Sequence, residues 1–328
     1  MVAFMQLLLS LSFLQNSGPT YDELFPQSRL PEVLSIRLVS ESSRSIKPCQ
    51  PFTAVFEVRL ADQALRSEWA QVARQASKVL RINDVDFTNR LSEGSTNSAC
   101  EFRFLWPEPT DGAAPPRSAE SALISADCQI NAITRSCLFL EPGQYRIEFV
   151  FGDHNLETRL AVNHPTGVER KIVDRLNVLP MLLFLRDPTD SQYATPENLG
   201  TLEELVAIPS DYSSLLGMVL SLAKQRVRDP SRAELTPEEK REELTARFAL
   251  LQPVTREARL TRRIAALAAW DLAMTAGALA RLEPNPEKRT EYTSLQATLF
   301  ERVSDCPLVP RERALAQAAA SASEQNPE

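Results

Sequence analysis

The spacing of apolar residues changes near residue 165, and this change constrains the fold more than any other feature of the chain. Before it, apolar residues alternate in short runs such as FTAVFEVRL at 52–60. Alternation with one polar face is typical of strands in an antiparallel sheet. After it, apolar residues recur every three or four positions, which is the period of amphipathic helices. The sequence therefore predicts a sheet-rich N-terminal part followed by an all-helical C-terminal part.

A chain of 328 residues is long enough for two domains that each bury a hydrophobic core. We expect an antiparallel β-sandwich over residues 30–164 and an all-α domain over residues 167–322. The segment NHPTG at 163–167 is the predicted connection between them. The polar residues 323–328 are predicted to form a disordered tail.

The clearest predicted strands form a hairpin at the end of the first part, where two alternating runs, 145–151 and 156–162, flank a turn. Pro142-Gly143 precedes Tyr145, and this arrangement resembles the tyrosine corner of immunoglobulin-like and fibronectin-like sandwiches. The resemblance implies that the Tyr145 hydroxyl bonds to the backbone a few residues upstream. The cysteine that antibody domains carry two residues after this tyrosine is absent, so the resemblance is to the wider group of sandwiches.

Recurring cap residues mark the starts of the predicted helices. Thr166 and Glu169 have the spacing of a capping box, in which the side chain and backbone of the two residues bond reciprocally. A cap residue followed by proline is a strong start signal, because proline suits the first helical position. An apolar stripe from Val168 to Leu179 predicts one continuous helix over this stretch. Further helix starts are predicted at Thr195, Thr236, Thr255 and Asn285.

Two helical stretches echo each other, one at 202–207 followed by Pro209 and one at 299–304 followed by Pro307. A second helix is predicted after each of them. The arrangement is similar to a degenerate tetratricopeptide-type helix pair, in which small residues and a closing proline set the packing. The resemblance implies a repeat-like array with a concave binding face, and the alternative is an irregular bundle.

The first 18 residues predict export from the cytoplasm to a periplasmic or secreted location. Residues 1–14 carry no charged side chain, and their apolar run fits the core of a signal peptide but is too short to span a bilayer. A buried N-terminal helix and a retained anchor are the alternatives. An exported chain can hold disulfides, but the spacing leaves the pairing open, and buried free thiols are the other reading. Four of the five cysteines lie in the sheet-rich part: Cys49, Cys100, Cys128 and Cys137.

Composition argues against several classes of function. The net charge of −7 disfavours nucleic-acid binding, which requires basic patches. Nine glycines and two histidines leave little material for phosphate-binding loops, histidine metal centres or general-base networks. Paired aspartates such as Asp84 and Asp86 are expected in turns rather than in calcium sites. No cofactor, no metal ion and no integral membrane span are therefore predicted.

Two features provide candidate site residues. Arg256, Arg259 and Arg263 are spaced to share one helix face, and guanidinium groups bind carboxylates or phosphates bidentately. A solvated helix face is the alternative for this strip. Asp271 lies within the apolar stretch 264–280, which predicts the central helix of the helical domain. We expect this carboxylate either to mark a site through a shifted pKa, or to reach a solvent window or an arginine partner.

Together these patterns favour a non-enzymatic binding or scaffold protein of the cell envelope or the extracellular space, with a protein or peptide partner. The sequence contains no nucleotide-binding loop, metal-ligand spacing or catalytic triad that supports catalysis. The alternatives are a structural assembly subunit and a hydrolase with a carboxylate site between the two domains. The sequence does not determine the ligand or the oligomeric state.

Overall fold

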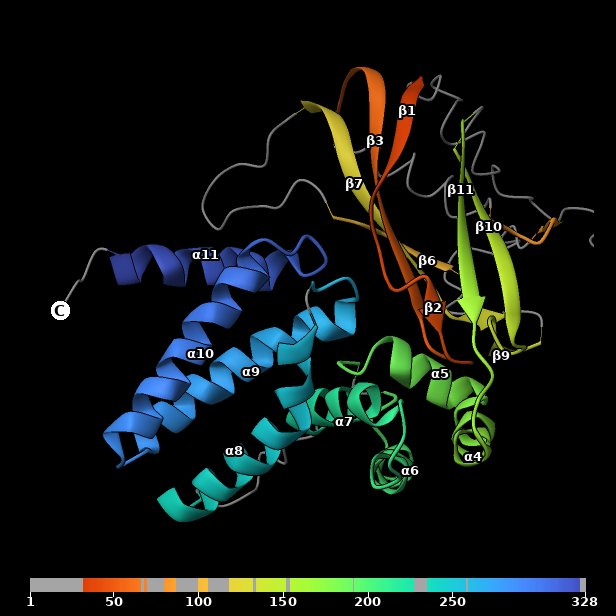
Figure 1. Ribbon diagram of the computed structural model, residues 1–328. Helices are drawn as coiled ribbons and strands as arrows, with labels where there is room; N and C mark the ends of the chain where they lie inside the picture. Colours follow the sequence, from red (N-terminus) through yellow and green to blue (C-terminus); the bar gives the residue numbers. More distant parts are fainter. Residues whose placement is uncertain are drawn as a thin grey trace, which may run out of the picture.

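The computed structural model has a sheet-rich N-terminal part followed by a helical C-terminal part (Figure 1). The last strand ends at Val162 and the first helix after it begins at Gly167, so the structure changes where the apolar period changes. The structure describes residues 32–65, 68–69, 80–86, 100–105, 118–131, 134–151, 154–190, 192–226, 235–257 and 259–324.

At each end of the chain, a predicted segment reaches beyond the described residues. The predicted signal peptide, residues 1–18, lies outside the described residues. The final helix extends to Glu324, two residues into the stretch that was expected to be a tail, and residues 325–328 lie outside the described part.

Two sheets and one short ladder form the N-terminal part. The strands are β1 (Val33–Glu41), β2 (Ser45–Ile46), β3 (Phe52–Leu65), β4 (Leu80–Ile82), β5 (Val85–Asp86), β6 (Cys100–Phe104), β7 (Ser118–Cys128), β8 (Ile130–Asn131), β9 (Ser136–Cys137), β10 (Gly143–Phe151) and β11 (His154–Val162). The first sheet has the order β1-β3-β7-β6 with antiparallel pairs. The second has the order β2-β11-β10-β4-β5, in which β2 runs parallel to β11 and the other pairs are antiparallel. The short ladder joins β8 to β9.

Aromatic and branched side chains fill the space between the two sheets. Alternation in β3 directs Phe52, Phe56 and their apolar neighbours to this side, where both phenylalanines are fully buried, as the sequence predicts. The Phe56 ring lies against Phe149 of β10, with 4.9 Å between the ring centroids. Glu57 on the opposite face of β3 instead accepts a hydrogen bond from an arginine of β1. Residues of both sheets therefore belong to one buried cluster.

A hydrogen bond from Tyr145 fixes the entry of the chain into the last hairpin. Its hydroxyl donates to the carbonyl oxygen of Glu141, four residues upstream, at 2.7 Å. This is the bond that the tyrosine-corner resemblance implies. Burial raises the pKa of Tyr145, which keeps the hydroxyl protonated as a donor. The ring packs edge-on against Phe139, with 5.4 Å between the centroids.

Helices form the C-terminal part, and four of the eight α-helices described there begin at a predicted cap, whereas the start predicted at Thr255 falls inside a 3₁₀ helix. They are α4 (Gly167–Leu176), α5 (Leu179–Arg186), α6 (Pro196–Val206), α7 (Ser213–Arg226), α8 (Pro237–Leu251), the 3₁₀ helix η1 (Gln252–Arg256), α9 (Arg263–Leu282), α10 (Pro286–Ser304) and α11 (Pro310–Glu324). Thr166 and Thr236 form complete capping boxes with the glutamates three residues later. Thr195 and Asn285 accept backbone hydrogen bonds at the starts of α6 and α10. These four predicted helix starts are confirmed.

The helix expected over residues 168–179 is interrupted after Leu176, and α5 begins a new axis. Pro180 in the first turn of α5 has no N–H group with which to continue the ladder of α4. The side chain of Asn177 accepts a hydrogen bond of 2.7 Å from the backbone N–H of Cys137. At the point where α4 ends, Asn177 therefore contacts the sheet-rich part.

The central helix of the C-terminal part is α9, as its apolar sequence predicts. It packs against α7, α8, η1 and α10. Within the described ranges, α9 is the one helix long and apolar enough to cross a membrane, and 78% of its apolar stretch is buried inside the protein. Its apolar side chains are therefore accounted for by packing in the core.

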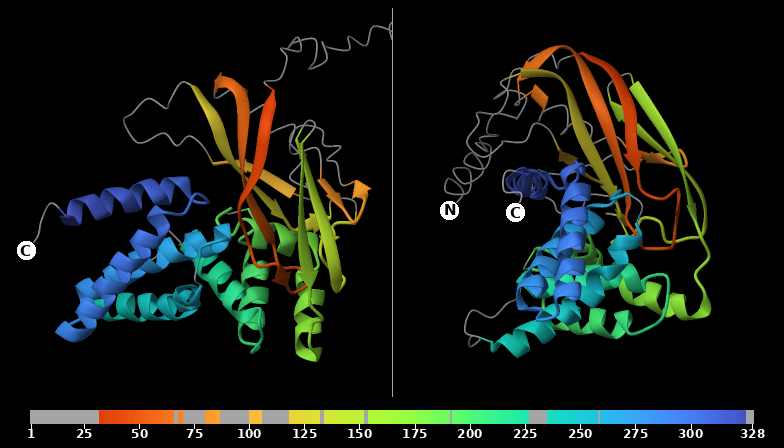
Figure 2. Two further views of the ribbon diagram at one scale, coloured as in Figure 1. Left: turned by 45° about the horizontal axis from the view of Figure 1, so that its top comes forward. Right: turned by 60° about the vertical axis from the view of Figure 1, so that its left-hand side comes forward.

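The two parts share a hydrophobic cluster. Val55, Leu105 and Ile130, at one end of the sheets, belong to the same buried cluster as residues of α5, α7 and α9. A second cluster is confined to the sheet-rich part. The helices lie against this one end of the sheets in every view (Figures 1 and 2). The junction between the two parts is therefore itself buried.

Candidate functional site

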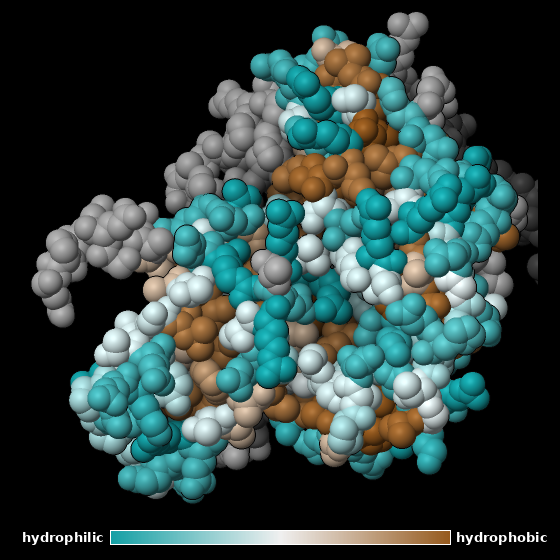
Figure 3. All heavy atoms as spheres, viewed as in Figure 1, coloured by the Kyte–Doolittle hydropathy of each residue, from teal (hydrophilic) through white to brown (hydrophobic). Residues whose placement is uncertain are grey.

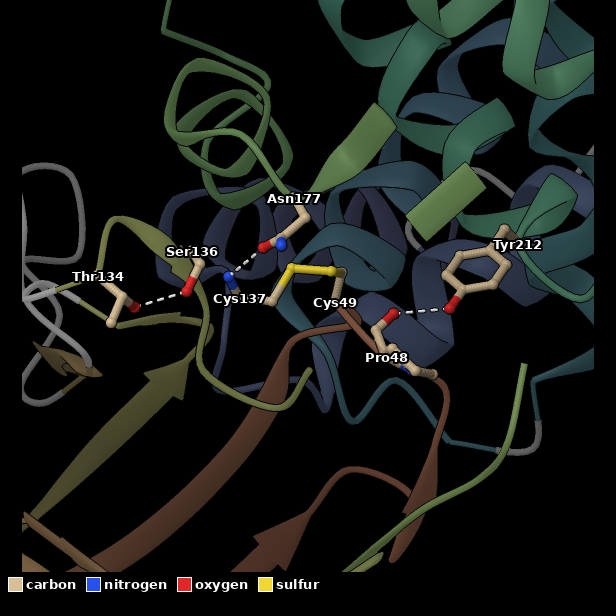
Figure 4. The surroundings of a disulfide bond; sticks show 7 residues. All are labelled: Pro48, Cys49, Thr134, Ser136, Cys137, Asn177 and Tyr212. Atoms are coloured by element: carbon tan, nitrogen blue, oxygen red, sulfur yellow. Dashed lines mark hydrogen bonds between the residues drawn. A yellow bond between two sulfur atoms is a disulfide. The ribbon is translucent and has the colours of Figure 1, made fainter. Parts of the chain in front are cut away.

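The loop before β3 is fixed between the sheets and the helices (Figure 4). Cys49 in this loop forms a disulfide with Cys137 of β9, with 5.0 Å between the Cα atoms, and both residues are buried. The backbone N–H of Cys137 donates to Asn177 of the α4–α5 connection. Next to Cys49, the buried Tyr212 hydroxyl donates to the Pro48 carbonyl oxygen at 2.7 Å. Burial raises the pKa of Tyr212, so this hydroxyl remains a donor.

The other cysteines differ in state. Cys128 of β7 is disulfide-bonded, and the residue opposite it in the backbone register of β6 is Cys100. Cys306 is a free and buried thiol, and burial raises its pKa, which keeps it protonated. Of the pairings that spacing left open, the structure assigns Cys49 to Cys137.

A cleft of about 760 Å³ lies beside this loop, between the sheet-rich part and the helices. The end of β1, the loop leading to β3 and Asn163 form one side. The first turn of α7 and the segment between η1 and α9 form the other. Hydrophilic residues gather around this boundary in the space-filling view (Figure 3). The polar and charged lining residues include Glu41, Ser43, Ser45, Lys47, Asn163, Asp211, Ser214, Glu257, Arg259, Thr261 and Arg262.

Lys47 connects the two sides of the cleft. Its ammonium group donates to Glu169 Oε2 at 3.0 Å and lies 3.4 Å from Asp211 Oδ2. The side chains of Lys47 and Glu169 are 16% and 3% exposed, so this ion pair is largely shielded from water. Glu169 also accepts the backbone N–H of Thr166 at 2.7 Å, in the capping box of α4. One carboxylate therefore caps a helix and anchors the sheet-side loop.

The pairing of Lys47 with Glu169 shifts both pKa values toward the charged forms. The hydrogen bond to Glu169 raises the pKa of Lys47 above its ordinary value of 10.5, against the effect of burial. Burial alone would raise the pKa of Glu169 above 4.5, but the hydrogen bonds from Thr166 and Lys47 outweigh it and lower the pKa. Both groups are therefore charged at neutral pH.

We expect Lys47→Met to lower the free energy of unfolding by about 2 kcal/mol near pH 7, because Glu169 stays buried without its cation. The lowered pKa of Glu169 stabilises the fold above the unfolded-state value, and this contribution is lost as pH falls through the folded-state value. The raised pKa of Lys47 stabilises the fold below the unfolded-state value, and this contribution is lost as pH rises through the folded-state value. In urea unfolding, the difference between the two proteins should be constant from about pH 5 to 10 and shrink at both extremes.

Lys171→Met provides the matched control, because Lys171 is an exposed lysine of α4. It should change the free energy of unfolding by less than about 0.5 kcal/mol. A loss in Lys47→Met that does not depend on pH would show that the aliphatic part of the side chain stabilises the junction, rather than its charge.

The expected helix face of arginines is wrong, because Arg256, Arg259 and Arg263 lie on three different elements. Arg256 is the last residue of η1 and is exposed, Arg259 lies in the segment that follows, and Arg263 begins α9. Of the three, Arg259 lines the cleft. Arg263 Nη1 lies 3.6 Å from Asp187 Oδ2 at the end of α5.

Bonds to α10 and to Cys306, which follows it, take up backbone carbonyl oxygens of the segment between η1 and α9. Arg302 donates to the carbonyl oxygen of Glu257, and the Cys306 thiol lies 3.5 Å from that of Leu260. These tertiary bonds take the place of a helical ladder, and the Glu257 backbone is extended. Arg262 closes the segment by donating to Glu257 Oε1 at 2.7 Å.

Asp271 is buried and pairs with an arginine, which confirms the second of the two expectations for it. Arg247 Nε donates to Asp271 Oδ2 at 2.9 Å, and Arg247 Nη2 donates to Oδ1. The pair is bidentate and joins α8 to α9. Asp271 does not line the cleft, so its role is to hold two helices together.

No group of three or more histidine, cysteine, aspartate or glutamate side chains in the described part of the chain could hold a metal ion. Asp84, considered as a calcium ligand, accepts a hydrogen bond from Arg146. Asp187 accepts the Thr189 hydroxyl at 2.6 Å, as is usual for an aspartate in a turn.

The residues that join the two parts are not apparent in the sequence. Lys47 and Glu169 lie 122 positions apart, and Glu169 is identifiable only as half of a capping box. The available signal is a pair of X-Pro steps, Lys47-Pro48 and Gln50-Pro51, which mark a stiff extended loop. No protein-family model, curated protein or solved structure matches this chain. The function is therefore inferred from the geometry of the cleft.

Proposed function

We propose that this chain is a non-enzymatic binding protein of the cell envelope or the extracellular space, and that it holds a segment of a protein or peptide partner in the cleft. The observation that carries the proposal is that each part of the chain supplies one wall. The Lys47–Glu169 ion pair and the hydrogen bond from Tyr212 to Pro48 hold these walls together. A site with fixed walls loses little conformational freedom on binding, which favours affinity.

The lining of the cleft suits a peptide backbone. Hydroxyl and amide side chains from both walls, among them Ser43, Asn163, Ser214 and Thr261, supply hydrogen-bond donors and acceptors. The volume of about 760 Å³ lies within the range of small-ligand sites, roughly 300–1,000 Å³. The cleft therefore fits a short segment of chain rather than the face of a whole domain.

The strand order supports an immunoglobulin-like sandwich for the sheet-rich part. The order β1-β3-β7-β6 corresponds to A-B-E-D, and β11-β10-β4 corresponds to G-F-C, the two sheets of that fold. The Tyr145 bond at the start of β10, in the F position, supports the same assignment. The contacting pairs α6–α7 and α10–α11 support a tetratricopeptide-like arrangement of the helices, which in repeat proteins presents binding surfaces.

Two observations support export as part of the proposal. Residues 1–14 have the apolar, uncharged composition of a signal-peptide core. Cys49 is bonded to Cys137, and Cys128 is bonded as well. Disulfides persist in oxidising compartments outside the cytoplasm.

A hydrolase is the second candidate, because Glu41, Asp211 and Glu257 bring three carboxylates to one cleft. Hydrolysis by paired carboxylates requires one of them to carry a proton as the general acid. Lysine and arginine side chains form ion pairs with all three carboxylates. These contacts support binding more strongly than catalysis.

Filling the cleft tests the proposal. Ser214 is exposed in the first turn of α7 and lines the cleft, so Ser214→Trp introduces a bulky ring there. We expect this variant to recover the partner from an envelope extract at least tenfold less well than the unmodified chain. Ser294→Trp, at an exposed position of α10 outside the lining, is the matched control and should recover it normally.

Each outcome separates the candidates. Equal recovery by the two tryptophan variants would place the partner outside the cleft and overturn the proposed site. Recovery of no partner by any form would count against a binding function. Recovery of cleaved fragments alone would favour the hydrolase, and a mass that rises with the concentration of the chain alone would favour the assembly subunit.

A further inference from the structure

The charged groups of the cleft do not all neutralise one another. Asp211 lies 3.4 Å from the Lys47 ammonium group, and Glu257 accepts a hydrogen bond from Arg262. Each of these charges therefore has a partner of opposite sign within the cleft. Arg259 lines the same cleft and forms no ion pair with any residue in the described part of the chain. Lys47 is shared by Asp211 and Glu169, and Arg262 pairs with Glu257. Arg259 is therefore the one cation of the cleft lining for which the described residues supply no carboxylate partner.

The Arg259 backbone is held in place from both directions. On its N-terminal side, the Glu257 carbonyl oxygen accepts a bond from Arg302 of α10, and on its C-terminal side Leu260 contacts the Cys306 thiol. The backbone N–H of Thr261 donates to the Arg259 carbonyl oxygen at 3.0 Å. A guanidinium group presents a planar set of donors that matches a carboxylate.

We propose that the cleft recognises a carboxylate of the bound peptide segment, and that Arg259 is the residue that pairs with it; this inference rests on the proposed function. The carboxylate is either the C-terminal group of the segment or an aspartate or glutamate side chain, because both present the same two oxygens. The hydroxyl groups of Ser214 and Thr261 line the same cleft and add neutral donors. Recognition of one carboxylate would neutralise the unpaired guanidinium without disturbing the internal pairs.

The experiment uses three pools of synthetic ten-residue peptides of randomised sequence. The first pool has free C-terminal carboxylates, the second has amidated ends, and the third has amidated ends and lacks aspartate and glutamate. The immobilised full chain is exposed to each pool at low ionic strength, and the retained peptides are quantified by mass spectrometry. Arg259→Gln is the test variant. Arg256→Gln is the matched control, because Arg256 is an exposed arginine just upstream that does not line the cleft.

We expect the chain to retain peptides from the first or second pool at least tenfold more than from the third. Arg259→Gln should lose at least tenfold of this retention, and Arg256→Gln should behave as the unmodified chain. Retention from the second pool equal to that from the first identifies an acidic side chain as the source. Retention confined to the first pool identifies the C-terminal group.

Two results would overturn the inference. Equal retention from all three pools, or unchanged retention by Arg259→Gln, would exclude a carboxylate contact while leaving peptide binding in the cleft intact. Retention from no pool would contradict both the carboxylate contact and the binding of short peptides in the cleft. The Ser214→Trp comparison then tests separately whether the cleft binds a protein partner.

Discussion

Replacing Cys49 and Cys137 together with alanine should lower the free energy of unfolding by about 4 kcal/mol. The disulfide joins residues separated by 88 positions, and a cross-link of that span strongly restricts the unfolded chain. Both cysteines also lie in the cluster that the sheets share with the helices, so the bond stabilises the junction. Equilibrium urea unfolding without reductant measures the effect.

Cys306→Ala is the control for loss of a buried sulfur, because this thiol is free. It should lower the free energy of unfolding by about 1 kcal/mol. A non-reducing digest should yield one linked pair of peptides that contains Cys49 and Cys137. A double variant within about 1 kcal/mol of the unmodified chain would contradict a disulfide at this position.

Arg247→Ala should lower the free energy of unfolding by about 3 kcal/mol. The side chain of Asp271 is 3% exposed, and its bidentate partner is Arg247. Removal of the arginine leaves a carboxylate in an apolar helix core, where its charge is poorly solvated. Thermal or urea unfolding detects a loss of this size, and the fold should remain helical by circular dichroism.

The double replacement Arg247→Leu with Asp271→Leu should recover most of that loss, because an apolar pair of similar volume requires no compensating charge. Arg281→Ala, at an exposed position near the end of α9, should change stability by less than about 0.5 kcal/mol. A double variant as unstable as Arg247→Ala would show that packing of the arginine stem, rather than charge, holds α8 to α9.

The features that the sequence predicts correctly depend on neighbouring residues. Alternation in 52–60 assigns the buried face of β3, since successive side chains of a strand point to opposite faces. Thr166, Thr195, Thr236 and Asn285 mark helix starts because the cap and the N–H it accepts lie within three residues. The change near residue 165 separates strands from helices for the same reason.

The features that the sequence does not predict depend on contacts between distant residues. Spacing alone would place Arg256, Arg259 and Arg263 on one helix, but Arg302 of α10 and Cys306, which follows α10, bond to the backbone of the segment between η1 and α9. The cleft forms where segments near residues 45, 163, 211 and 259 meet, and no local pattern encodes that meeting. The apolar surroundings of Asp271 predict a buried carboxylate, but its partner Arg247 lies on another helix and has no local signal.

The apolar end of the sheets limits how this gene can be rearranged. Val55, Leu105 and Ile130 are covered by side chains of the helices. A truncated protein that lacked the helices would expose these apolar side chains to water, and exposed apolar surfaces promote aggregation. A recombination event that moved only one of the two coding regions into another gene would therefore produce an aggregation-prone fragment. We expect the two parts to remain together in one gene.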